Sequence, residues 1–282
     1  MTMVKRWSYS RLATYLTRCS LQYFFRYIAK IEPERNSSRL AYGSAIHTGL
    51  EAAHLSWESG EPVPLEVAQE AFVADLEIRL KDPILEFREG ETPEGLIDQG
   101  KALLAAWAAE AEFQEVIDTE LEFSVPVVHP TTGEVLDAEL TGIIDLLVKV
   151  PNSPSPLVID FKTSARRYAA TQLDMDLQAA IYGYAIRHIH GVDTVPMRWE
   201  VLVKTKKPGI QKIDFVRGPE GDARLFELVK AAERGVAAGV FHPNDGSMWC
   251  SGCPYTSACS RWEEDPNAIS VDSARALTRT YS

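Results

Sequence analysis

The chain has 282 residues, of which 45% are hydrophobic and 24% are charged, so it can bury a sizeable core in one large domain or two small ones. No run approaches the roughly 18 apolar residues of a membrane-spanning helix, and the start MTMVKRWSYS lacks the apolar core of a secretion signal. These features predict a soluble, cytoplasmic protein, in which clustered cysteines are expected to be metal ligands and not disulfides.

The net charge of −11 argues against a broad surface for nucleic acid, but it does not exclude a local site. Carboxylates that hold a divalent metal ion can present positive charge to a phosphate while the surrounding surface stays acidic. Basic residues also gather locally, at Arg166 and Arg167, at Lys204, Lys206 and Lys207, and at Arg18, Arg26, Lys30 and Arg35. Each of these groups could equally be a solvated face.

Helical periodicity dominates the first part of the chain. Apolar and aromatic residues spaced three and four apart predict a helix over 8–30 that carries Cys19, with Ser8 or Ser10 as its N-cap. Further helical patterns cover 42–58, 65–80 and 94–117.

The later part of the chain alternates strands and helices. Strands are predicted at 120–128, 138–150 and 156–163 as a meander, then a helix over 171–189 capped by Thr171, strands at 197–205 and 210–216, and a helix over 219–237. This order predicts an α/β core with a mixed sheet. There is no internal repeat or low-complexity tract, so a single domain spanning 1–282 is expected.

Two carboxylates lie inside otherwise apolar strands. Asp145 falls in GIIDLLV and Asp160 in VIDFKT, where an isolated charge would be costly unless it were paired or bound to metal. Strand alternation puts Asp160 and Lys162 on one side and Phe161 on the other. Two carboxylates and one ammonium are therefore expected to meet at one point.

Asp145 followed by the DFK of 160–162 resembles the PD-(D/E)XK nuclease superfamily, and specifically its RecB-like branch. Three further motifs match that branch: YGSAIH with His47, QAAIY with Gln178 and Tyr182, and the opening SYSRLATYLTRCSLQYFFRY. With the terminal C-x2-C-x5-C, the resemblance spans about residues 8–260. It implies a restriction-endonuclease-like mixed sheet with a large helical N-terminal part, a helical insertion at 59–118 and an iron–sulfur tail at 241–282.

The resemblance also implies roles for these residues. Asp145 and Asp160, with His47 and the Phe161 carbonyl, would hold Mg2+ or Mn2+, which carboxylate, carbonyl and imidazole ligands suit. Lys162 would orient or deprotonate the attacking water and stabilise charge on the phosphate. Gln178 and Tyr182 would contact the DNA strand or fix the lysine and the water.

An additional acidic residue on the first strand, either Glu120 or Glu122, could assist this site. The sequence leaves the choice between these two glutamates open.

Four cysteines form a separate motif, with Cys250, Cys253 and Cys259 inside ten residues and Cys19 near the other end. The pattern is similar to that of CRISPR-associated RecB-like exonucleases and the AddB nuclease domain, in which it implies a [4Fe-4S] cluster that clasps the C-terminal tail. A four-cysteine zinc site is the alternative, which C-x2-C alone would favour.

The activity implied is end-directed cleavage of single-stranded DNA in recombination, DNA repair, phage replication or CRISPR adaptation. Because no G-x4-G-K-[S/T] motif occurs, the chain carries no helicase motor, and a helicase or recombination protein is a candidate partner. The alternative is a non-catalytic DNA-binding or decoy subunit of a larger nuclease complex. The presence of His47, Asp145, Asp160 and Lys162 favours the enzyme.

Overall fold

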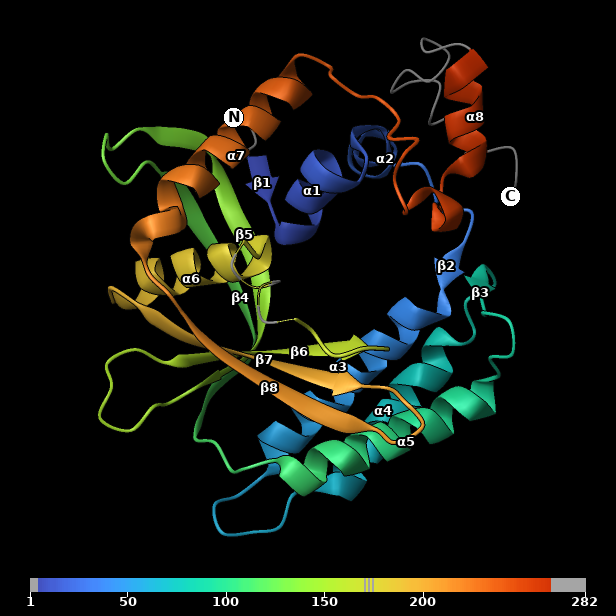
Figure 1. Cartoon of the computed structure of the whole chain (residues 1–282), viewed down its shortest axis with the longest axis vertical. Helices are drawn as coiled ribbons and strands as arrows, with labels where there is room; N and C mark the ends of the chain where they lie inside the picture. Colours follow the sequence, from blue (N-terminus) through green and yellow to red (C-terminus); the bar gives the residue numbers. More distant parts are fainter. Residues whose placement is uncertain (1–4, 170, 172, 174, 265–282) are drawn as a thin grey trace. The chain divides into compact units, whose positions relative to one another are not determined.

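The computed structural model describes residues 5–264 except 170, 172 and 174, so the end of the expected tail, 265–282, lies outside the described residues. The chain forms two compact units (Figure 1). One unit comprises 37–126 and 140–222, and we call it the sheet unit. The other comprises 1–36, 127–139 and 223–282, and we call it the cysteine unit. The expectations of one domain and of an insertion at 59–118 stay predictions.

The sheet unit is built on a mixed sheet, as predicted. Its strands are β4 (Val116–Val128), β5 (Val135–Val148), β6 (Leu157–Ser164), β7 (Val195–Val203) and β8 (Gly209–Arg217). β4 pairs with β5 and β5 runs antiparallel to β6, which confirms the predicted meander. β6 and β7 are parallel, whereas β7 and β8 are antiparallel. The outer ends of β4 and β5 belong to the cysteine unit.

A layer of three helices lies on one side of this sheet, in which α3 (Ser38–Ser56) and α5 (Pro93–Glu110) contact the strands and α4 (Leu65–Arg79) packs against both helices (Figure 1). Their buried side chains form one core with alternate residues of the strands, among them Ile159, Phe161 and Leu202. The three helices expected in these regions are present, but α3 begins at Ser38, before the expected 42, and α5 ends at Glu110, before the expected 117, because β4 begins at Val116. The short strands β2 (Asn36–Ser37) and β3 (Leu85–Glu86), which pair with each other, were not predicted.

The parallel pair β6 and β7 is joined by α6 (Leu177–His190), the crossover that a parallel connection requires. This helix begins six residues later than predicted, and its N-cap is Asp176, whose side chain accepts a hydrogen bond from the Ala179 amide, and not Thr171. Gly191 ends it in a left-handed conformation.

The predicted helix over 8–30 is interrupted at Cys19. Ser8 caps α1 (Tyr9–Ala13) as expected, a π-helical turn covers Thr14–Arg18, and Cys19 is extended with φ −165°. α2 (Ser20–Tyr23) and a second π-turn at Phe24–Ile28 follow. The spacing of apolar residues could not reveal this interruption, because apolar side chains are buried at helical spacing both before and after Cys19.

The cysteine unit has two further helices, α7 (Asp222–Ala237) and α8 (Thr256–Glu264), of which only α7 was predicted. A 3-10 turn at Pro219–Gly221 precedes α7 and another at Cys250–Gly252 precedes α8. The strand β1 (Lys5–Trp7) lies beside β5. A small core joins Leu21 and Phe25 to Tyr255 and Ala258.

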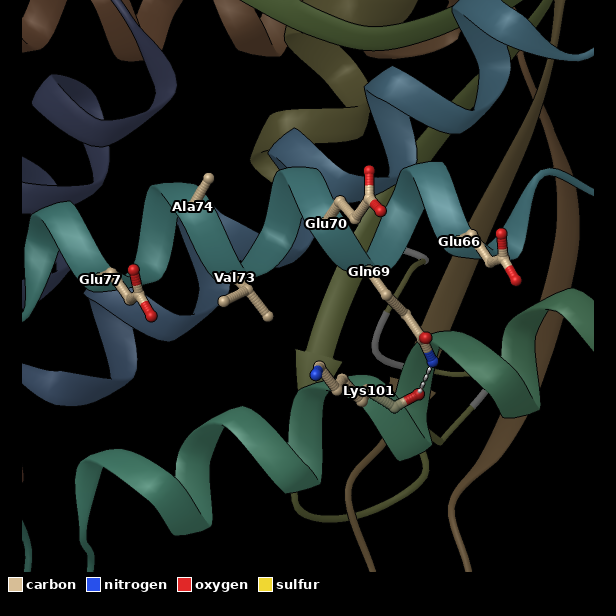
Figure 2. A pocket seen from close by; sticks show the side chains of 7 residues that line it. All are labelled: Glu66, Gln69, Glu70, Val73, Ala74, Glu77 and Lys101. Carbon is tan, nitrogen blue, oxygen red and sulfur yellow. Dashed lines mark hydrogen bonds between the residues drawn. The ribbon is translucent and has the colours of Figure 1, made fainter.

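An open groove of about 440 Å3 runs between α4 and α5 (Figure 2). It is lined by Glu66, Gln69, Glu70, Val73, Ala74, Glu77 and Lys101. The Gln69 side chain donates a hydrogen bond to the Lys101 carbonyl across it. Within the described residues, no helix is long and apolar enough to cross a membrane.

The packing of α4 against α5 depends on Gly100. A Cβ at this position would lie 2.0 Å from the ring of the fully buried Phe72. We expect Gly100→Ala to lower the free energy of unfolding by about 1–2 kcal/mol, because overpacking costs about 1–3 kcal/mol and the helix gains only about 0.5–1 kcal/mol from alanine. Urea unfolding measures the change.

Gly221→Ala is the control, since nothing lies within 4 Å of a Cβ at Gly221 and its backbone is not left-handed. Equal stability of the Gly100→Ala variant and the unsubstituted protein would contradict the close packing of these two helices.

Candidate active site

The site forms where β5 and β6 stop pairing. The last paired residues are Leu146 and Ile159. Asp145, which precedes Leu146, and Asp160, which follows Ile159, therefore lie just beyond the end of this pairing. At this point the Asp145 side chain bridges the two strands, because its Oδ2 accepts a hydrogen bond of 2.8 Å from the Phe161 amide. Its other oxygen, Oδ1, lies 3.3 Å from His47 Nδ1 on α3. Asp145 thereby joins the end of the strand pair to the helical layer.

Asp160 and Lys162 form a buried ion pair on the face of the sheet opposite Phe161. Asp160 is 1% exposed, and its Oδ2 lies 2.5 Å from Lys162 Nζ. The pair confirms the predicted strand alternation. The face of Trp199, on the neighbouring strand β7, lies 5.6 Å from the Lys162 ammonium.

Gln178 on α6 holds this ion pair in place. Its Oε1 accepts a hydrogen bond of 2.8 Å from Lys162 Nζ, and its amide nitrogen donates to Asp160 Oδ1 at 3.0 Å and to Tyr182 Oη at 2.9 Å. Tyr182 Oη in turn donates to the Ile143 carbonyl at 2.5 Å. Both amide hydrogens of Gln178 and the hydroxyl hydrogen of Tyr182 are therefore used within the protein.

Burial and charge act in opposite directions on the ion pair. Burial raises the pKa of Asp160, and the neighbouring Asp145 carboxylate adds to this, while the Lys162 ammonium opposes it. Burial disfavours the Lys162 ammonium, but the carboxylates of Asp160 and Asp145 outweigh burial and raise the pKa of Lys162. Lys162 is therefore held as a cation.

A second group of ligand atoms lies beside the ion pair. One atom each of His47, Glu120 and Asp145 lies within 4.8 Å of the others, and among the described residues no other three His, Cys, Asp or Glu side chains do so. Burial raises the pKa of Glu120, and the carboxylates of Asp145 and Glu51 raise it further. Glu51 follows His47 by one turn of α3.

The structure distinguishes Glu120 from Glu122, which the sequence could not. Glu120 has a φ of 49°, a left-handed conformation that is uncommon for a residue other than glycine. Glu122 is exposed, as are Ser124 and Pro126, which share its side of β4. Regular alternation would turn Glu120 the same way. The irregular backbone at Glu120 accompanies its placement beside His47 and Asp145, and the sequence carries no signal for it.

The donor set fits a divalent cation. Carboxylates and an imidazole suit Mg2+ and Mn2+, and a bound cation would relieve the repulsion among the gathered carboxylates. The nearby ammonium of Lys162 is already paired with Asp160. Asp145, Glu120 and His47 are positioned as ligands, and the expected contributions of Asp160 and the Phe161 carbonyl stay predictions.

The four cysteines all lie in the cysteine unit and form no disulfide. Cys19, Cys253 and Cys259 pack around the core that joins α2 to α8. Burial raises the pKa of Cys253, and the charges of Cys19 and Cys250 add to it. Burial raises the pKa of Cys259 to about 11, with contributions from the Glu263 carboxylate and then from Cys19 and Cys253. The four thiols therefore lie close enough together for their charges to interact.

The loop before α8 is tied to the segment around Cys19. The Leu21 amide and the Ser20 hydroxyl both donate to the His242 carbonyl, and Asn244 donates to the Arg18 carbonyl. Cys250 Sγ contacts the Asn244 carbonyl at 3.3 Å. These bonds bring the two ends of the described chain together within one unit.

Comparisons with known proteins identify the family. No curated protein matches the chain. Among solved structures, a protein of Eubacterium rectale described as "Putative exonuclease" is similar with a TM-score of 0.51 and 15% identity, covering 87% of this chain and 85% of its own. The structure of SSO0001 is similar with a TM-score of 0.37 and 13% identity, covering 89% of this chain and 94% of its own.

The PD-(D/E)XK nuclease superfamily matches residues 6–260, which cover the whole sheet unit, most of the cysteine unit and every residue of the acidic site. The mixed sheet flanked by helices is the restriction-endonuclease-like fold expected from the sequence, and divalent metal ions such as Mg2+ or Mn2+ are the cofactors of this superfamily. The chain belongs to the PD-(D/E)XK nuclease superfamily.

Proposed function

We propose that this nuclease is a metal-dependent exonuclease of the RecB-like branch that hydrolyses phosphodiester bonds of single-stranded DNA from an end. The observation that carries the proposal is the hydrogen-bonded set of Asp160, Lys162 and Gln178 next to the acidic group of His47, Glu120 and Asp145. The motifs of the RecB-like branch and the description of the Eubacterium rectale protein support the exonuclease assignment. Recombination, repair, phage replication or CRISPR adaptation would each use such an activity.

The metal site is assigned to residues from four elements, α3, β4, β5 and β6. Asp145, Glu120 and His47 would hold Mg2+ or Mn2+, with Asp160 and the Phe161 carbonyl as the remaining protein ligands. When bound, the ion supplies Lewis acidity and lowers the pKa of a coordinated water. The protein contributes a preformed set of donors, because the Phe161 amide fixes one Asp145 oxygen and His47 faces the other.

Lys162 is assigned to the reacting phosphate. An ammonium has three N–H donors, of which those facing Asp160 and Gln178 account for two, so at least one remains for substrate. That donor would bind a non-bridging oxygen of the scissile phosphate or the attacking water. A fixed cation at this point stabilises the charge that develops in the transition state.

Gln178 and Tyr182 are assigned as positioning residues and not as DNA contacts. All the hydrogens that their amide and hydroxyl can donate are bound to Asp160, Tyr182 and the Ile143 carbonyl. This arrangement anchors the Lys162 ammonium to the backbone of β5 through α6. Of the two roles that the sequence left open, holding the lysine is the one these contacts support.

The cysteine unit is proposed to carry a [4Fe-4S] cluster on Cys19, Cys250, Cys253 and Cys259. A tetrahedral zinc site has Zn–S bonds of about 2.3 Å, which places its sulfurs about 3.8 Å apart. No three of these sulfurs lie within 4.8 Å of one another in the described chain. A four-iron cluster, in which each thiolate binds a different iron, accommodates wider spacing. The cluster would clasp α8 to the segment that carries Cys19.

Removing either member of the ion pair tests catalysis. We expect Asp160→Asn and Lys162→Ala to lower kcat on DNA by about a thousandfold or more, since each loses transition-state stabilisation. Mn2+-dependent release of nucleotides from an end-labelled single strand measures the rate. Full activity in either variant would refute the catalytic assignment of that residue, whereas no cleavage by the unsubstituted protein would leave a DNA-binding subunit as the better description.

The two glutamates of β4 supply a matched control for this experiment. Glu120→Gln should reduce activity and raise the Mn2+ concentration needed for half-maximal rate. Glu122→Gln should do neither, because that side chain is exposed outside the group.

End dependence distinguishes an exonuclease from an endonuclease. We expect a linear single strand to be degraded and a circular single strand of the same sequence to persist, with a blunt duplex degraded more slowly than the linear strand. Gel electrophoresis over time measures the three rates. Equal loss of circular and linear strands would contradict end-directed cleavage while leaving the nuclease assignment intact.

Iron and labile-sulfide analysis tests the cluster. Protein purified without oxygen should be brown and hold about four irons per chain, the count of a [4Fe-4S] cluster. Cys253→Ser should lose the iron and lower the thermal stability. Ser260→Ala, on α8, changes an exposed hydroxyl that bonds only within its helix and should change neither. Stoichiometric zinc without labile sulfide would establish the zinc alternative.

A further inference from the structure

We propose that basic residues at the carboxyl ends of β6 and β7 bind the sugar–phosphate backbone of a single DNA strand beside the active site, an inference that rests on the proposed function. The residues are Arg166, Arg167, Lys204, Lys206 and Lys207, and we call them the strand-end patch.

The strand-end patch is a local reversal of charge in an acidic protein. Residues 161–173 and 201–213 contain seven lysines and arginines and no aspartate or glutamate, whereas the chain carries −11 overall. Arg166, Arg167, Lys206 and Lys207 are exposed. Within the described part of the chain, none of these four makes an ion pair. Like charges gathered without counter-charges repel one another and attract a polyanion.

The sheet topology brings the two basic segments to one edge. Because β6 and β7 are parallel, they end together, with Ser164 beside Val203 (Figure 1). The Lys204 amide donates to the Ser164 carbonyl at 2.8 Å, and the Arg166 amide donates to Ser164 Oγ at 3.2 Å. Segments far apart in the sequence therefore present their cations side by side.

The same edge continues directly from the catalytic lysine. Lys162 precedes Ser164 by two residues on β6, and the Cα atoms of Lys162 and Arg166 can be at most about 14 Å apart. Long arginine and lysine side chains extend this reach. A strand whose scissile phosphate contacts Lys162 would bring its neighbouring phosphates to the patch.

Lys204 is the most fixed cation of the patch. Its Nζ lies 4.6 Å from the centre of the buried Tyr42 ring on α3. Burial lowers the pKa of Lys204, and the nearby charges of Glu91 and Arg88 act on it in opposite directions. Glu91 accepts hydrogen bonds from the Ser38 hydroxyl at 2.6 Å and the Arg88 amide at 3.0 Å, both through Oε2, and in the described part of the chain it makes no ion pair with Lys204. A cation held on an aromatic face remains available to a phosphate.

The groove between α4 and α5 cannot serve this purpose. Three of its lining residues, Glu66, Glu70 and Glu77, carry negative charge against the single cation of Lys101 (Figure 2). A phosphate backbone would be repelled there. Within the described sheet unit, the edge next to Lys162 therefore offers the better-matched surface for DNA.

The test combines DNA binding with turnover of a small phosphodiester. Binding of a fluorescent single-stranded oligonucleotide is measured by anisotropy without divalent metal over a range of KCl concentrations. For Arg166→Gln/Arg167→Gln and for Lys206→Gln/Lys207→Gln, we expect affinity at low salt to fall about tenfold and the slope of log K against log salt to shrink by about 1.4, the value for two lost phosphate contacts.

Lys101→Gln/Lys149→Gln is the control with the same change in net charge. Lys101 lines the groove, and Lys149 follows β5 at the end of the sheet opposite Ser164. This variant should keep the unsubstituted affinity and slope. Loss of affinity equal to that of the patch variants would overturn the proposal, because net charge alone would explain it. Patch variants with unchanged affinity and slope would overturn it as well.

Turnover of bis(4-nitrophenyl) phosphate with Mn2+ separates this proposal from the proposed function. The small diester reaches the metal and Lys162 but is too short to touch the strand-end patch, so the patch variants should retain its turnover. If the unsubstituted protein cleaves neither the small diester nor DNA, the nuclease proposal fails, while the binding measurements still decide whether the patch holds DNA.

Discussion

The structure of the site depends on one constraint, the need to compensate the carboxylate of Asp160, which is 1% exposed. A buried charge is tolerated only when it is paired and hydrogen-bonded. Lys162 supplies the counter-charge and Gln178 the hydrogen bond, and Gln178 is itself fixed through Tyr182 to the Ile143 carbonyl. The compensation thus links β6 to α6 and β5, and the same contacts that satisfy the buried carboxylate also orient the Lys162 ammonium.

The mixed sheet explains why a group of acidic residues and a group of basic residues lie close together. The antiparallel pair β5 and β6 separates beyond Leu146 and Ile159, so Asp145 and Asp160 are not paired with each other, although Asp160 still pairs with Trp199 of β7. The parallel pair β6 and β7 continues to Ser164 and Val203 and brings two basic segments to one edge. Asp160 and Lys162 on β6 are therefore followed, just beyond Ser164, by the basic residues of the strand-end patch, an order that under the proposed function would let an acidic protein bind a polyanion locally.

The cysteine unit differs from the sheet unit in having short helices and a small core. Its helices near Cys19 are short and interrupted by π-turns, and the core that joins them to α8 contains only a few buried side chains. Small cores of this kind gain stability from metal ligation or cross-links. A cluster bound by Cys19 and the three later cysteines would supply it without taking part in the chemistry at Asp145, which lies in the other unit.

The sequence by itself determined the order of the main strands and helices and the meeting of Asp160 with Lys162, because strand alternation and apolar periodicity are local properties of the chain. Local pattern did not reveal the interruption at Cys19, the start of α6 at Leu177 or the left-handed backbone at Glu120. Tertiary structure also decided which glutamate of β4 joins His47 and Asp145, and that Gln178 holds Lys162. Both outcomes depend on contacts between segments far apart in the sequence, where packing and burial outweigh the preference of any single segment.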